Sequence, residues 1–189
     1  SWLQQASDST NATFTIDGGN PITLPLTEQA EIHPVLSYVA LGSSTAAGTG
    51  ASDENHSQVG LIHRALEEEF GTVRLSNLSQ DGGRVLDFRG KWGEINSANP
   101  DIVTILPFTD YLSSDTSSWR TNYPKLLDDI PSTGAHVFFG DLRIDPDYIC
   151  HIGSGPGGCY SFYEFEAISE KNAILRDIVS TRPDVTIVP

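Results

Sequence analysis

Apolar residues gather in short runs at regular intervals along the chain from about residue 35 onward. The run Asp101–Leu106 is rich in β-branched residues and is typical of a strand buried within a parallel sheet. A second run, Val35–Leu41, ends in a loop of small residues. Further strands are predicted at 73–75, 135–139 and 185–188.

Helical patterns alternate with these runs. Val59, Ile62, Leu66 and Phe70 share one face of a predicted helix over 57–70, and Gly71 stands where that helix should stop. Residues 162–180 carry a second apolar stripe, made of Phe165, Ile168, Leu175 and Ile178 or Val179. A more polar helix is predicted around 118–130.

Strands that alternate with helices over short connections predict one α/β domain, three layers thick, with a parallel sheet covered on both faces. This domain is expected to span 34–189. Residues 1–33 are expected to form an N-terminal extension, in which two alternating segments flank Asp17–Asn20 and predict a β-hairpin.

Charge narrows the range of partners. The net charge is −14 with only three lysines and no basic run, so phosphate backbones and anionic membrane surfaces would repel the protein. We therefore expect no nucleic acid partner. No apolar run reaches the length of a membrane span. A chain that begins at Ser1 and contains no Met is expected to be a processed or trimmed product.

The chain contains two cysteines, Cys150 and Cys159, which flank a short glycine-rich loop. A disulfide closing this loop is expected outside the cytosol, and two free or metal-binding thiols are the alternative. The disulfide and the acidic composition favour an extracellular or secreted protein.

The loop that follows the first core strand is the best candidate for chemistry. Leu41–Ser52 lies where ligands bind in open α/β sheets, at the carboxyl end of a strand. A serine there can present its hydroxyl to a cleft while backbone N–H groups face a developing oxyanion. The alternative is a loop that only turns the chain or binds phosphate. No Walker A lysine follows, and the dinucleotide fingerprint is absent from this turn.

The segment Tyr38–Gly50 resembles the first block of SGNH (GDSL-type) hydrolases, G-D-S-x-x-x-G. Aligning Gly42, Ser44 and Gly48 places Ser44 in the nucleophile position, and Ser43 replaces the usual Asp. The resemblance implies a flavodoxin-like three-layer fold, a serine esterase activity on simple or carbohydrate O-acyl esters, and no cofactor.

Two later segments are similar to further blocks of this family. Asn77–Gly83 resembles the second block, which implies that the Gly82 N–H helps to form the oxyanion hole together with the Ser44 N–H. Pro107–Asp110 resembles the third block, G-x-N-D, with Thr109 in place of the Asn that is another oxyanion donor. Losing one such donor typically costs about 3 kcal/mol of transition-state stabilisation.

A serine nucleophile needs a base, usually a His oriented by a carboxylate. The family takes both from a D-x-x-H motif after the last strand, but this sequence ends at Pro189 directly after the run 185–188. His151 and His56 are the remaining candidates, and the general base stays unknown. His56 belongs to Asp53–His56, which is better interpreted as a polar helix start.

No metal site is predicted. Asp141, Asp145 and Asp147 match no EF-hand spacing and are expected to lie in a solvated loop. The leading hypothesis is therefore a secreted SGNH-type ester hydrolase acting through Ser44, with Asp and His supplied by a C-terminal segment or a second chain. The alternatives are a degenerate SGNH-like domain that binds a glycan or protein, and an acyltransferase on the same scaffold.

Overall fold

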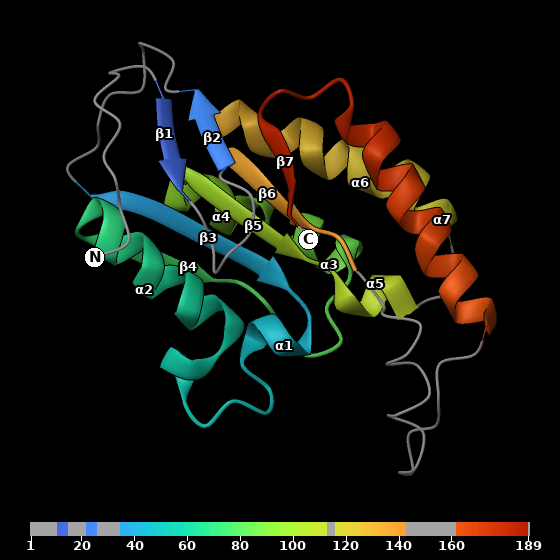
Figure 1. Cartoon of the computed structure of the whole chain (residues 1–189), viewed down its shortest axis with the longest axis horizontal. Helices are drawn as coiled ribbons and strands as arrows, with labels where there is room; N and C mark the ends of the chain where they lie inside the picture. Colours follow the sequence, from blue (N-terminus) through green and yellow to red (C-terminus); the bar gives the residue numbers. More distant parts are fainter. Residues whose placement is uncertain (1–10, 15–21, 26–34, 113–115, 143–161, 189) are drawn as a thin grey trace. The chain divides into compact units, whose positions relative to one another are not determined.

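The computed structural model divides the chain into two compact units, Ser1–Pro34 and Val35–Pro189. It describes residues 11–14, 22–25, 35–112, 116–142 and 162–188 (Figure 1). In the first unit, β1 (Asn11–Phe14) pairs with β2 (Ile22–Pro25) as an antiparallel two-stranded sheet.

The second unit is built on a five-stranded sheet whose strands all run parallel, in the order β4-β3-β5-β6-β7. The predicted parallel α/β fold is thereby confirmed. The strands are β3 (Leu36–Gly42), β4 (Val73–Asn77), β5 (Ile102–Leu106), β6 (His136–Gly140) and β7 (Val185–Val188).

Helices connect these strands. Three long ones were predicted: α2 (Gln58–Phe70), α6 (Ser117–Asp129) and α7 (Phe162–Val179). Helix α2 begins where the Ser57 hydroxyl accepts the Gly60 N–H and ends at Gly71, whose φ is 84°. Phe70, expected on its buried face, is instead 43% exposed.

Several short elements were not predicted. They are α1 (Ser44–Ala47), α3 (Val85–Gly90), α4 (Trp92–Ala98), α5 (Phe108–Leu112) and η2 (Ile130–Thr133). A further short element, η1 (Glu54–His56), forms where Asp53–His56 was interpreted as a polar helix start. Each contains at most seven residues, which is too short to establish a helical period. The spacing of the apolar residues Val85, Phe88 and Ile95 was the one sequence signal for α3 and α4. All three are buried, and a break at Lys91 divides them between the two helices.

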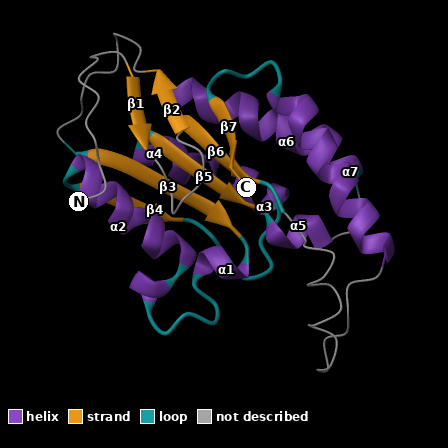
Figure 2. Cartoon of the chain, in the orientation of Figure 1, coloured by secondary structure: helices purple, strands orange, loops and turns teal. Residues whose placement is uncertain are grey.

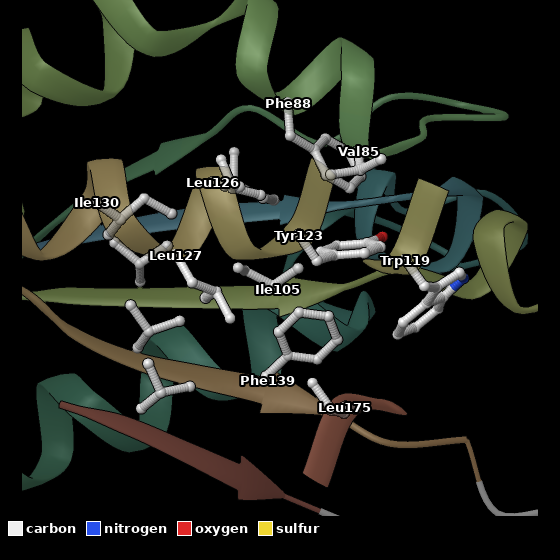
Figure 3. Close-up of a cluster of buried hydrophobic side chains, with 14 of the residues drawn as sticks. Val85, Phe88, Ile105, Trp119, Tyr123, Leu126, Leu127, Ile130, Phe139 and Leu175 are labelled. Carbon is white, nitrogen blue, oxygen red and sulfur yellow. The ribbon is translucent and has the colours of Figure 1, made fainter. Parts of the chain in front are cut away.

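The main core lies on one face of the sheet. Odd-numbered strand residues such as Val39, Ile105 and Phe139 point into it and meet side chains of α3, α4, α6 and α7. Figure 3 shows Tyr123 and Trp119 of α6 beside Phe139, and the Tyr123 and Phe139 ring centroids are 5.1 Å apart. Helix α2 contacts β3 and β4 (Figure 1). No described helix is long and apolar enough to cross a membrane.

Candidate active site

Ser44 lies at the carboxyl end of β3, in the first turn of α1. Because β3 has β4 on one side and β5 on the other, the loops after these two strands flank the Ser44 loop. Figure 2 shows the strand arrowheads pointing to the edge of the sheet where α1 and α5 lie. The Ser44 side chain is partly exposed, whereas Ser43 is fully buried.

Close packing fixes the start of this loop. A Cβ atom at Gly42 would lie 2.4 Å from the Ala46 Cβ and 3.0 Å from the Leu106 carbonyl oxygen, so only glycine fits without movement. The Ser43 N–H donates to that same Leu106 oxygen at 3.2 Å. The turn that carries Ser44 is thus pressed against the end of β5.

The second loop, after β4, is bonded to the nucleophile loop through its backbone. The Gln80 N–H donates to the Gly42 carbonyl oxygen at 3.0 Å. Gly82 is exposed and has a φ of 68°, a conformation that favours glycine. Gly83 makes the close approach, since a Cβ there would lie 2.9 Å from the Gly42 oxygen. The sequence interpretation assigned a role only to Gly82, although the Gly-Gly pair was visible.

The third loop, after β5, is bonded to the other side of the nucleophile loop. The Thr109 N–H donates to the Ser43 Oγ at 3.3 Å. The residue that replaces the family's Asp therefore accepts a hydrogen bond from the residue that replaces its Asn. This contact could not be predicted from a local pattern, because the two residues are 66 positions apart.

These bonds determine which N–H groups can face an oxyanion. In the described part of the chain, neither the Ser44 N–H nor the Gly82 N–H donates to another residue. The Thr109 N–H is occupied by Ser43, so the hydroxyl is the only donor that Thr109 can direct at substrate. The structure thus places Ser44 between the loops of Gly82 and Thr109.

Asp110 links the third loop to two helices. Its Oδ2 accepts the Val85 N–H at 2.7 Å and the Tyr123 hydroxyl at 2.6 Å. Burial raises the pKa of this carboxyl, and the bonds from Tyr123 and Val85 act against that rise. Asp110, which matches the family's third block, therefore holds the start of α3 and the middle of α6 in register.

Three histidines are described, and each is engaged away from Ser44. His56 Nδ1 lies 2.8 Å from the Asp53 Oδ1 at the start of η1, in an exposed pair that lowers the pKa of Asp53. His63 Nε2 lies 3.0 Å from the Val73 oxygen. His136 Nε2 lies 2.9 Å from the Thr186 Oγ1, and burial lowers its pKa.

The Asp53–His56 pair thus has the structure of a polar helix start. His151, Cys150 and Cys159 lie outside the described residues, so the expected disulfide and the second base candidate have no structural description here.

A small pocket of about 90 Å³ opens at the tips of β5 and β6, beside α1. Asp141, one of the residues that line this pocket, was expected to lie in a solvated loop. Its side chain is only 3% exposed and lies 3.4 Å from the Arg176 Nη2 of α7, so it is an ion-paired residue and not part of a solvated loop. The pocket is lined by Thr45, Gln58, Leu106, Pro107, Phe108, Tyr111, Gly140, Asp141 and Leu142.

Among the described side chains, no group of three or more His, Cys, Asp or Glu residues is placed to hold a metal ion.

Comparison with known proteins identifies the fold. No family model and no curated protein matches the sequence. Solved structures do match: TesA at a TM-score of 0.62 and 18% identity, over 80% of this chain and 76% of that one. AlinE4, an SGNH-hydrolase family esterase, matches at 0.61 and 18%, over 82% and 76%. The psychrotrophic esterase EstA from Pseudoalteromonas sp. matches at 0.56 and 21%, over 80% and 76%.

The second unit therefore has the fold of the SGNH hydrolases, as the three blocks predict. At these identities the likeness establishes the fold. Activity has to be argued from the site.

Proposed function

We propose that this chain is the core of a serine ester hydrolase of SGNH type, with Ser44 as the nucleophile. The observation that carries the proposal is the position of Ser44 between two loops that are each hydrogen-bonded to its own loop, through Gly42 on one side and Ser43 on the other. A serine held in this way can attack an acyl carbon while N–H groups from two loops receive the oxyanion.

The proposed reaction follows from these donors. The Ser44 Oγ attacks the acyl carbonyl, its proton passes to an imidazole base, and the Ser44 and Gly82 N–H groups bind the oxyanion. The alcohol then leaves with that proton, and water hydrolyses the acyl-enzyme. The substrate is an O-acyl ester of a simple alcohol or a carbohydrate, and no cofactor is required.

Each of the three described histidines is hydrogen-bonded to a residue other than Ser44, and His151 lies outside the described residues. We propose that Asp and His are supplied by a segment beyond Val188 or by a second chain. The strand β7 ends at the same edge as β3, so a segment that follows it starts on the correct side of the sheet.

A fluorophosphonate probe tests the proposal, since labelling needs an activated serine. We expect one labelled peptide, containing Ser44, and complete loss of labelling in Ser44→Ala. Ser52→Ala is the matched control, because Ser52 is exposed and lies in the same loop region. Hydrolysis of p-nitrophenyl acetate should follow the same pattern. If Ser44→Ala is labelled as fast as the unmodified protein, the assignment is wrong.

A second candidate function is favoured by the engaged histidines and by the replacements at Ser43 and Thr109. It is a non-catalytic domain that binds a glycan or protein through the same edge. Absence of both labelling and hydrolysis, also in the presence of the segment or chain that is proposed to supply Asp and His, would favour this candidate.

An extracellular location is part of the main proposal and depends on the expected Cys150–Cys159 disulfide. Peptide mapping without reduction tests it: a linked peptide pair supports secretion, whereas two free thiols remove the argument.

A further inference from the structure

We propose that Ser43 is a positioning residue for the reaction of Ser44, an inference that rests on the proposed function. Ser43 is fully buried, and its Oγ accepts the Thr109 N–H at 3.3 Å. A buried hydroxyl that contacts the third loop while its own backbone begins the nucleophile turn couples these two parts of the site directly.

The backbone of Ser43 strengthens this coupling. Its N–H donates to the Leu106 oxygen at 3.2 Å, and its carbonyl oxygen accepts the Ala47 N–H at 2.9 Å. Ser43 is therefore bonded to the end of β5, to the start of α5 and to the helix that carries Ser44. A shift of Thr109 relative to Ser44 requires at least one of these bonds to break.

The chemistry of Thr109 makes this position important. Its hydroxyl stands on a shorter side chain than the amide of the Asn that the family carries, so it reaches a smaller region. The distance from Thr109 to an oxyanion is then set by its backbone, and Ser43 holds that backbone. Displacements of about 1 Å are enough to lower catalysis strongly.

The two departures from the family pattern thus form one contact. A carboxylate at position 43 would bury a charge, which is costly unless it is paired. A serine hydroxyl accepts the same N–H without a charge. The replacements at positions 43 and 109 are therefore coupled through one hydrogen bond and are not independent of each other.

The test compares Ser43→Ala with a matched control, Ser37→Ala. Ser37 lies near the start of β3, the strand whose end precedes Ser43, is 5% exposed, and its hydroxyl donates to the Ala98 oxygen at 2.8 Å. Both variants lose one buried serine hydrogen bond. We expect fluorophosphonate labelling of Ser44 to slow about threefold to tenfold in Ser43→Ala only, which is the effect of one hydrogen bond.

With p-nitrophenyl acetate, kcat should fall by the same factor while KM stays unchanged. Equal slowing in Ser43→Ala and Ser37→Ala, with equal losses of thermal stability, would overturn the proposal.

A measurement that needs no activity separates this inference from the proposed function. Amide hydrogen exchange at Thr109 should accelerate in Ser43→Ala and stay unchanged in Ser37→Ala. Unchanged exchange at Thr109 overturns the positioning role even if the protein is an active esterase. If the unmodified protein, tested together with the segment or chain that supplies Asp and His, shows neither labelling nor hydrolysis, the proposed function fails, and faster exchange still supports the role of Ser43 in holding the loop.

Discussion

Two regions of the candidate site are held together in different ways: the loops around Ser44, here the Ser44 end, and the residues around the tip of β6, here the β6 end. Around Ser44, the hydrogen bonds that join neighbouring loops have backbone N–H donors, namely those of Gln80 and Thr109. Around the tip of β6, the connections depend on side chains of α7. Asn172 accepts the Tyr111 hydroxyl at 2.7 Å and donates to the Leu142 oxygen at 2.9 Å, and Lys171 donates to the Tyr111 oxygen at 2.8 Å.

This difference has a consequence for the effect of substitutions. The bond from the Gln80 N–H to the Gly42 oxygen is independent of side chains, and the Thr109 N–H needs only an oxygen acceptor at position 43, so the geometry around Ser44 tolerates many substitutions. The β6 end has no such protection. A single substitution on α7 can loosen it without moving Ser44.

The largest effect is expected at Asp110, where one carboxyl oxygen serves two donors. Asp110→Ala leaves the buried Tyr123 hydroxyl and Val85 N–H without their acceptor. Each unsatisfied donor costs about 1–3 kcal/mol, so we expect the free energy of unfolding to fall by about 3 kcal/mol. Urea denaturation at pH 7 measures it.

Asp110→Asn is the control, because it keeps an oxygen acceptor and removes the titration. Burial raises the pKa of Asp110 above its unfolded value of 3.8, so the native protein binds this proton more tightly. The stability that this gives is fully present below pH 3.8 and is lost as pH rises through the native pKa. Asp110→Asn should therefore gain stability relative to the unmodified protein between pH 3.5 and pH 7. A constant difference would show that Asp110 does not titrate in this way.

The fold could be predicted from the sequence because each strand and long helix has its own local pattern of apolar residues, and the alternation of these elements implies the parallel sheet. The run 101–106 and the capped helix that starts at Ser57 carry their own evidence. The site was only partly predictable. Ser44 is marked by its place after a strand, but the acceptor role of Ser43 depends on Thr109, and the ion pair of Asp141 depends on Arg176, 35 positions away. Side-chain partners brought together by folding leave no mark on a single sequence.

A smaller effect is expected at Gly42, where a substitution displaces the backbone of the loop that carries Ser44. Gly42→Ala places a Cβ 2.4 Å from the Ala46 Cβ, so α1 must shift. Overpacking of this kind costs about 2 kcal/mol, and labelling of Ser44 should fall with it. Gly93→Ala is the control, since a Cβ there meets nothing within 4 Å, and in α4 it should stabilise by about 0.5 kcal/mol. Thermal unfolding and labelling rates of both variants test this, and undiminished labelling in Gly42→Ala would contradict the backbone account.

The smallest effect is expected at Asn172, which tests the β6 end. Asn172→Ala removes one bond to the Tyr111 hydroxyl and one to the Leu142 oxygen, two residues that line the pocket. We expect a loss of about 1.5 kcal/mol in the free energy of unfolding. Fluorophosphonate labelling of Ser44 should be unchanged, because among the described residues no hydrogen bond joins the nucleophile loop to α7, while KM for p-nitrophenyl esters rises. Ser97→Ala removes an exposed hydroxyl bond to the Gly93 oxygen and is the control. If Asn172→Ala slows labelling as much as Gly42→Ala does, the two ends are coupled and the contrast between them is wrong.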